Sequence, residues 1–234
     1  MIYKCLLFIL LLCISFCTQA DINVSPMIVD LLGKESETEI AVKNFDTKTN
    51  AYVEITPFRL SNPADHASSK RRVLHPDKDG LIIFPAKLVL LPGQTQFVRV
   101  IKTAKSVAAD QVYEVDFIPK VATHLVSQKN PNGMMMGIRV IIGYGVRVTV
   151  RPDHPLPSLF LKKIKNKLII KNTGNTLLTI TSCTQQVSNK KSEIPLPTYT
   201  LFAGQTIKKK LGQSTPVTLN ALFMGKPLDA LYAD

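Results

Sequence analysis

Residues 134–152 constrain the fold of this chain more than any other segment. Ile138, Val140, Ile142 and Tyr144 recur there with period two, and a β-strand places alternate side chains on one face. Ordinary strands run to about five or six residues, so the segment predicts one strand roughly three times the usual length. Such a row offers more apolar surface than a small domain needs. We expect part of it to be presented to another protein; the alternative is that all four side chains face the core of their own domain.

The rest of the chain predicts further strands and no helix. Apolar residues do not recur at the i, i+3, i+4, i+7 spacing of a helix. Short β-rich runs recur instead, about 8–12 residues apart and separated by turn residues such as Pro92-Gly93, which is typical of an all-β sandwich. The predicted runs before the long strand are 22–31, 38–44, 51–60, 81–90, 96–102 and 111–121. Those in the last part of the chain are 159–164, 167–171, 176–181, 199–202, 206–211 and 217–223, with a last short run after them.

A proline-rich stretch divides the chain. Residues 152–157 hold three prolines, which cannot donate to a sheet ladder and stiffen a connection. We therefore predict an immunoglobulin-like domain at 21–151 that carries the long strand, a linker at 152–157, and a second β-sandwich domain at 158–234. The second domain is small for an independent core without disulfides. We expect it to pack against the first, which gives an L- or boomerang-shaped all-β protein with an interdomain cleft.

The first 20 residues predict a cleaved secretory signal peptide. Lys4 precedes a nearly unbroken apolar stretch at 6–16, and Thr18-Gln19-Ala20 supplies small residues for cleavage. No later window holds the ~18 consecutive apolar residues of a membrane helix, so we expect an exported protein without stable membrane insertion. Three of the four cysteines leave with the signal peptide. The remaining Cys183 follows an apolar stretch, which favours a buried inert thiol over an intermolecular bridge.

The net charge points to acidic partners. It is +12 for the chain and +11 without Lys4, which suits nucleic acid, a membrane surface or an acidic protein. Lys70-Arg71-Arg72 and Lys208-Lys209-Lys210 are interpreted as solvated surface. Aromatic residues do not interleave with the basic ones, and an exported protein does not meet nucleic acid. We therefore expect no nucleic-acid partner.

No catalytic or metal-binding motif is evident in the sequence. The four histidines fall in four separate loop-like stretches without ligand spacing. Asp110, Glu114 and Asp116 are interpreted as the polar decoration of one strand. Glu114 and Asp116 share a face, so a paired-acid site is conceivable, but solvated or salt-bridged charges are the favoured interpretation. The sequence predicts a non-enzymatic protein without cofactor or metal.

Several segments, taken in order, resemble the periplasmic chaperones of the chaperone–usher pathway, which fold and deliver pilus subunits. The resemblance covers nearly the whole mature chain and is greatest for the branch that includes colonisation-factor and common-pilus chaperones. The segments are 81–100 with its Pro-Gly turn, 110–117, 138–152, and 172–175 followed by 177–180.

The resemblance implies a mechanism and a set of residues. These chaperones lend their seventh strand to a subunit that resembles an immunoglobulin domain lacking its last strand, a form of strand addition. Ile138, Val140 and Ile142 match the residues that fill the subunit groove, and Tyr144 or Met136 extends the row. Arg147 matches the basic residue that binds the subunit's terminal carboxylate. The implied partners are pilin or fimbrial subunits and an outer-membrane usher, in the periplasm, with self-association when free.

The chain departs from the family pattern at one position. The family has a second cleft base in its first strand, whereas the matching residues 25–30 carry none. Three alternatives stay open: Lys87 replaces that base, Arg147 acts alone, or Asp30 forms a salt bridge with Arg147. An exported two-domain adhesin or surface-associated binding module is the alternative function.

Overall fold

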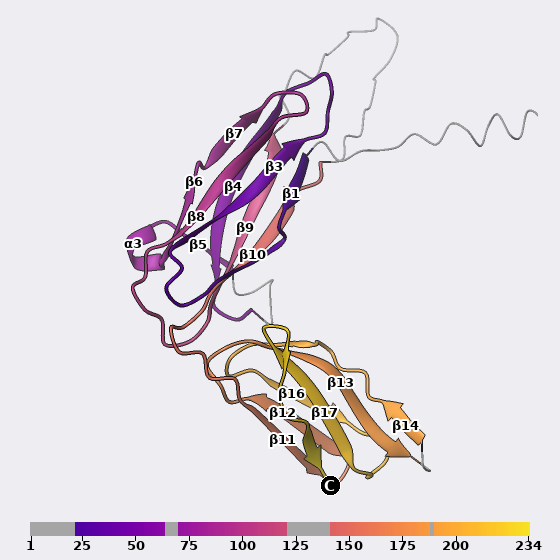
Figure 1. Ribbon diagram of the computed structural model, residues 1–234. Helices are drawn as coiled ribbons and strands as arrows, with labels where there is room; N and C mark the ends of the chain where they lie inside the picture. The colour runs from indigo at the N-terminus through magenta and orange to yellow at the C-terminus, as the bar shows by residue number, and fades with distance from the viewer. Residues whose placement is uncertain (1–21, 64–69, 121–140, 188–189) are drawn as a thin grey trace, which may run out of the picture.

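The computed structural model describes residues 22–63, 70–120, 141–187 and 190–234 (Figure 1). The predicted signal peptide and three residues of the predicted row, Met136, Ile138 and Val140, lie outside these ranges. The described residues form strands almost throughout, and their helix, α3, spans only Pro76–Asp79. Figure 1 shows two elongated bodies set at an angle and joined at one end, with β1 to β10 in one and β11 to β19 in the other. The predicted two-domain all-β fold is confirmed.

The first body is a sandwich of two sheets. One sheet has the order β1-β3-β8-β6, and the other has the order β2-β10-β9-β4-β5 with β7 also paired to β4. Side chains that alternate along these strands meet between the sheets, and Ile40, Val98, Val115 and Phe117 are fully buried there. The strands are β1 (Ile22–Ser25), β2 (Ile28–Leu31), β3 (Glu37–Asn44), β4 (Ala51–Leu60), β5 (Lys70–Arg72), β6 (Leu81–Phe84), β7 (Lys87–Leu90), β8 (Thr95–Lys102), β9 (Gln111–Lys120) and β10 (Tyr144–Val150).

Two of the predicted runs are each divided between the two sheets. The run at 22–31 forms β1 in one sheet and β2 in the other, and the run at 81–90 forms β6 and β7 in the same way. Pro26 and Pro85, both preceded by cis peptide bonds, stand at the two crossings. Proline has no N–H for a sheet ladder, so the pairing ends there and the chain is redirected to the opposite sheet.

The second body is also a two-sheet sandwich. A three-stranded sheet has the order β11-β12-β16, and the other has the order β14-β13-β17-β18 with β15 on β13 and β19 on β17. Leu168, Ile170, Leu201 and the thiol-bearing Cys183 are fully buried between them. The strands are β11 (Leu159–Ile164), β12 (Lys167–Asn172), β13 (Leu178–Val187), β14 (Lys190–Glu193), β15 (Thr200–Leu201), β16 (Thr206–Lys210), β17 (Val217–Phe223), β18 (Lys226–Pro227) and β19 (Leu231–Ala233).

The expectation of one very long strand needs correction over the residues that the structure describes. Strand β10 begins at Tyr144 and ends at Val150, and residues 141–143 have no strand pairing. The alternating sequence pattern runs on past this point, but a strand also needs a partner for its backbone groups. The ladder with β9 reaches no further than the pair Tyr144–Phe117.

Candidate functional site

One margin of strand β10 lacks a partner strand along three of its seven residues. On one side, all seven residues of β10 pair with β9 in antiparallel register. On the other side, β2 pairs in parallel only with the stretch from Arg147 to Val150. Within the described residues, Tyr144, Gly145 and Val146 therefore form an open edge.

The hydrogen-bond alternation fixes which backbone groups this edge offers. Arg147 N donates to Met27 O at 3.0 Å, so the odd-numbered residues of β10 direct their N–H and C=O groups toward β2. Gly145 has the same parity and lies just beyond the end of β2. Its N–H and C=O therefore point from the sheet toward the open side, where another strand could pair with them.

The structure places the two described members of the predicted row differently. Tyr144 is half-buried and packs against the core, on the face shared by the fully buried Val146, Val148 and Val150. Ile142 has the same parity but stands before the strand, and 54% of its surface is exposed. The interpretation that the row faces its own core thus holds for Tyr144 and does not hold for Ile142. Ile138 and Val140 lie outside the described residues.

The two glycines at this margin, Gly143 and Gly145, allow close approach of neighbouring atoms. A Cβ on Gly143 would lie 3.3 Å from the carbonyl oxygen of Phe117, which is tighter than ordinary contact. A Cβ on Gly145 would lie 2.8 Å from Oε1 of Glu114. A glycine at 145 therefore leaves space for a carboxylate on the outer face of the sheet, opposite the core.

Arg147 lies on this outer face beside that carboxylate. Its neighbours in register are Ile28 on β2 and Glu114 on β9. Its side chain is half-buried, and its Nε is buried without a hydrogen-bond partner in the described part of the chain. Among those residues Arg147 also forms no ion pair. It is a cation at the margin of the sheet whose hydrogen-bonding capacity is not used up.

The Glu114–Asp116 pair is held by a lysine. Lys70 Nζ lies 3.0 Å from Glu114 Oε1 and 2.8 Å from Asp116 Oδ2, and it also stands 4.5 Å from the centre of the Phe58 ring. Burial raises the pKa of Asp116, and the hydrogen bond from Lys70 opposes that shift. Burial lowers the pKa of the Lys70 ammonium, but its hydrogen bonds to Asp116 and Glu114 outweigh this effect, so that the pKa of Lys70 lies above its usual value. This arrangement supports the salt-bridge interpretation over a paired-acid site.

Asp30 does not pair with Arg147. The parallel register puts Arg147 opposite Ile28, and Asp30 opposite Thr149, two residues further along β10. Asp30 Oδ1 therefore accepts from Nη2 of Arg151 at 3.0 Å. The alternative that pairs Asp30 with Arg147 is therefore wrong, because nothing in the sequence indicates the register that brings Asp30 to Arg151 instead.

Arg151 belongs to a buried polar cluster at the junction of the two bodies. Its Nη1 donates to Asp110 Oδ2 at 3.0 Å and to Thr176 Oγ1 at 2.8 Å. The same Asp110 oxygen accepts from Leu177 N at 2.7 Å. Burial raises the pKa of Asp110, while the hydrogen bond from Leu177 and the charge of Arg151 oppose the shift. Asp110 is thus a junction residue, and its interpretation as strand decoration is wrong.

Sequence reasoning missed the residues of the second body that complete this cluster. The side-chain amide of Asn175 donates to Ala108 O at 3.1 Å, and the backbone carbonyl of Asn175 accepts from Asp110 N at 2.9 Å. The signal that could have found them is the turn-forming composition of residues 172–175. Such a turn at the end of a domain is well placed to contact a neighbour.

The junction also holds a pocket, as expected for an interdomain cleft. Its volume is about 500 Å³, and Arg59, Arg71 and Asp110 of the first body and Phe202 of the second contribute to its lining. Arg147 is not among the lining residues. Lys87 lies on β7, three strands away from β10 in the order β10-β9-β4-β7. That separation is about 14 Å, so Lys87 is too far away to hold one carboxylate together with Arg147.

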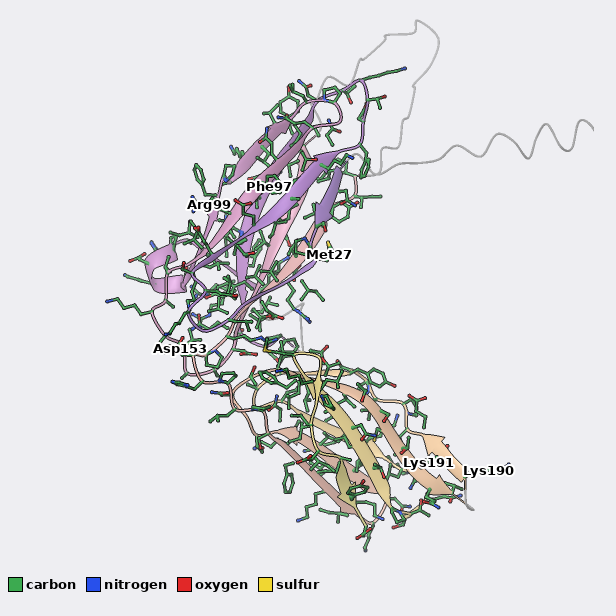
Figure 2. All side chains as sticks on the ribbon, in the orientation of Figure 1. Met27, Phe97, Arg99, Asp153, Lys190 and Lys191 are labelled. Atoms are coloured by element: carbon green, nitrogen blue, oxygen red, sulfur yellow. The ribbon has the colours of Figure 1, made fainter. Side chains whose placement is uncertain are left out.

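Apolar side chains continue the open margin on β2. Met27 and Ile28 are 43% and 54% exposed, and Ile28 is the register neighbour of Arg147. Met27 is labelled in Figure 2 on the same margin of the upper body as β10. The margin thus combines unpaired backbone groups, exposed apolar side chains and one cation.

Within the described ranges, no group of three residues is arranged to hold a metal ion. Over the same residues, no helix has the length and apolar character needed to cross a membrane.

Comparison with known proteins gives structural neighbours only. No family model and no curated protein matches the chain. Among solved structures, a chain from a chaperone–tip adhesin complex of CFA/I fimbriae biogenesis has a TM-score of 0.71 at 18% identity, with 91% of this chain and 97% of that chain covered. The class 5 fimbriae chaperone CfaA has a TM-score of 0.68 at 19% identity, with 90% and 97% covered. A chain from the Salmonella enterica SafA pilin–SafB chaperone complex has a TM-score of 0.58 at 14% identity, with 92% and 96% covered.

These likenesses extend over both bodies, since each covers about nine tenths of the chain. The chain therefore has the two-domain immunoglobulin-like fold of the fimbrial chaperones.

Proposed function

We propose that this protein is a periplasmic, non-enzymatic chaperone that binds and folds fimbrial subunits and delivers them to an outer-membrane usher. The open edge of β10, with exposed Ile142 two residues before it, is the observation that carries the proposal. A subunit that lacks one strand has the complementary defect, an apolar groove bordered by unpaired backbone groups. Residues from the predicted row fill that groove while Gly145 and its neighbours supply the ladder.

The burial of apolar side chains in the subunit groove favours this strand addition. Each aliphatic side chain moved from water into a groove contributes about 1.5–3 kcal/mol before ordering costs. Ile142 is exposed before binding and so has surface to bury. Ile138 and Val140 continue the same alternation and are proposed as further groove-filling residues. Tyr144, already packed on the core, is proposed to mark the end of the row that enters the subunit.

Arg147 is proposed to anchor the subunit by its terminal carboxylate. Among the described residues it has no ion pair to break, and an arginine can bind a carboxylate through two parallel hydrogen bonds. In the free protein the same open edge is suited to pairing with a second copy, which would cover its apolar margin. The structural neighbours support the proposal, because they include chaperones in complex with a tip adhesin or a pilin.

The test is co-expression in a bacterial periplasm with a candidate fimbrial subunit, followed by co-purification. Ile142→Asp places a charge in the row and abolishes the complex. Ile141→Asp is the matched control, because Ile141 is similarly exposed at 46% but falls on the opposite face of an extended segment. It retains the complex. Normal subunit capture by a folded Ile142→Asp variant overturns strand lending.

A further inference from the structure

The outer face of the sheet β11-β12-β16 carries a regular array of lysine and apolar side chains. The registers of the two ladders place nine outward residues in three rows. Eight of them are exposed, and the ninth, Ile169, is half-buried at the centre. We call this array the lysine face. Its first row is Phe160, Lys171 and Thr206, its second row is Lys162, Ile169 and Lys208, and its third row is Ile164, Lys167 and Lys210.

Five of the nine residues are cationic, and none is acidic. Lys167 and Lys210 are direct cross-strand partners, an arrangement of like charges that destabilises a sheet. Lys162 and Lys208 flank Ile169 from the two sides in the same row. In the part of the chain that the structure describes, no lysine of the face forms an ion pair. Folding alone therefore gives no reason to gather these charges.

The charge of the chain is concentrated in this domain. Residues 158–234 contain eleven lysines, no arginine and three carboxylate side chains, which gives a formal charge of +8 out of +12 for the whole chain. The excess is not spread evenly over the protein surface. Five of the eleven lysines lie on one face of the sheet β11-β12-β16, where they produce a concentrated positive field.

We propose that the lysine face binds the surface of an anionic phospholipid bilayer. Arginine is the preferred residue for bidentate binding of a defined carboxylate or phosphate, whereas lysine acts as a point charge that suits a diffuse layer of headgroups. Phe160 and Ile164, 46% and 47% exposed, lie among the lysines and can enter the interfacial region of a bilayer.

This surface is separate from the open edge of β10. Figure 1 shows β11, β12 and β16 in the lower body and β10 in the upper one. A chain held on a membrane by its second domain therefore keeps its strand edge available. The inference does not depend on the proposed function, since it rests on the charge and register of a different sheet.

The test is sedimentation of the mature chain with vesicles of phosphatidylcholine alone or with about one third phosphatidylglycerol. We expect binding only to the anionic vesicles and loss of that binding in 0.5 M NaCl.

Each lysine near an anionic surface contributes about a fivefold factor to binding, so the triple variant Lys162→Gln, Lys167→Gln, Lys208→Gln binds about 100-fold more weakly. The matched control Lys190→Gln, Lys191→Gln, Lys226→Gln removes the same charge from the other sheet and binds within about threefold of wild type. Figure 2 labels Lys190 and Lys191 on that sheet.

A second measurement reports directly on the face. The chain contains no tryptophan, so Phe160→Trp provides a single tryptophan, whose emission can be excited selectively, within the array. Its emission shifts to the blue with anionic vesicles, and that of Phe97→Trp in the first body does not. The proposal is overturned if wild type shows no preference for anionic vesicles or if both triple variants weaken binding equally. It is also overturned, in favour of an acidic protein partner, if polyglutamate binds the face while vesicles leave the emission of the Phe160→Trp variant unchanged.

Discussion

Arg151 Nη1 lies 3.0 Å from Asp110 Oδ2, and the two side chains are 4% and 2% exposed. Arg151 directly follows β10, whose other end carries the open edge, and Asp110 directly precedes β9, the partner of β10. The same carboxylate oxygen accepts a hydrogen bond from Leu177 N in the second body. This buried ion pair therefore links the strand that bears the candidate site to the second domain.

Breaking this pair from one side destabilises the protein. Arg151→Met leaves the buried Asp110 without its cation, and the loss of a single partner from a buried pair costs about 3–5 kcal/mol. Urea unfolding followed by circular dichroism measures the loss. The double variant Arg151→Met, Asp110→Asn removes both charges, so it loses less than the two single variants added together. A loss below about 1 kcal/mol for Arg151→Met would contradict the coupling.

Arg147 affects binding and not stability, if the carboxylate anchor is right. Arg147→Ala removes a cation that has no ion pair in the described ranges, so the unfolding midpoint stays near that of wild type. Charge-assisted hydrogen bonds contribute about 1.5–3 kcal/mol, so affinity for an intact subunit falls about 10- to 100-fold. A subunit with an amidated C-terminus binds wild type and variant alike. Arg72→Ala, at an exposed position on the same sheet, is the matched control; equal weakening by both variants would argue against the anchor.

The sequence predicted the fold well where alternation carried the information. The strands at Leu159–Ile164 and Val217–Phe223 have the predicted bounds. Along each of them, more buried and more exposed side chains alternate, because one face of the strand is turned to the core. Strand β14 was missed, because all four of its residues, Lys190–Glu193, are polar and exposed. A strand at the edge of a sheet that buries no side chain leaves no periodic signal.

The site was less predictable, since it depends on register and on contacts between domains. The alternation of apolar and polar residues assigns Asp110 to the margin of a strand. It carries no information on the second domain, which covers Asp110 in the structure. The alternative that pairs Asp30 with Arg147 is wrong because the offset between β2 and β10 follows from the whole sandwich and not from either segment. The interpretation of Glu114 and Asp116 as salt-bridged charges is confirmed, because a local charge pattern is sufficient for it.

Gly174 is required where the linker meets the second domain. A Cβ at this position would lie 2.0 Å from the carbonyl oxygen of Leu156 and 2.8 Å from the backbone nitrogen of Ser158. Both are backbone atoms and cannot move aside like a side chain, so Gly174→Ala destabilises the protein by about 2–3 kcal/mol. Gly212→Ala is the matched control, because no atom lies within 4 Å of its added Cβ. Thermal unfolding compares the two variants; equal stability would show that the linker yields to the added methyl group.

Cys183 behaves as an inert thiol in the folded protein. It is fully buried, and burial raises the pKa of its thiol from 9.0 to about 11, so about one molecule in a thousand carries a thiolate at pH 8. Labelling by a thiol reagent at pH 8 therefore follows the rate of unfolding, and non-reducing electrophoresis shows no linked dimer. Rapid labelling of the native chain would contradict the prediction.

The raised pKa of Cys183 also gives stability a defined pH dependence. The folded state favours the protonated thiol, so this contribution is complete below pH 9 and is lost as the pH rises toward 11. Cys183→Ala lacks the titrating group. The difference in the free energy of unfolding between wild type and Cys183→Ala therefore shrinks by on the order of 2 kcal/mol over this window. Urea titrations at pH 8, 9, 10 and 11 measure it, and subtracting the variant removes the shared contribution of Tyr113, whose pKa burial raises to about 12. A difference that stays constant across the series would mean that the thiolate is as well accommodated in the folded core as in the unfolded chain.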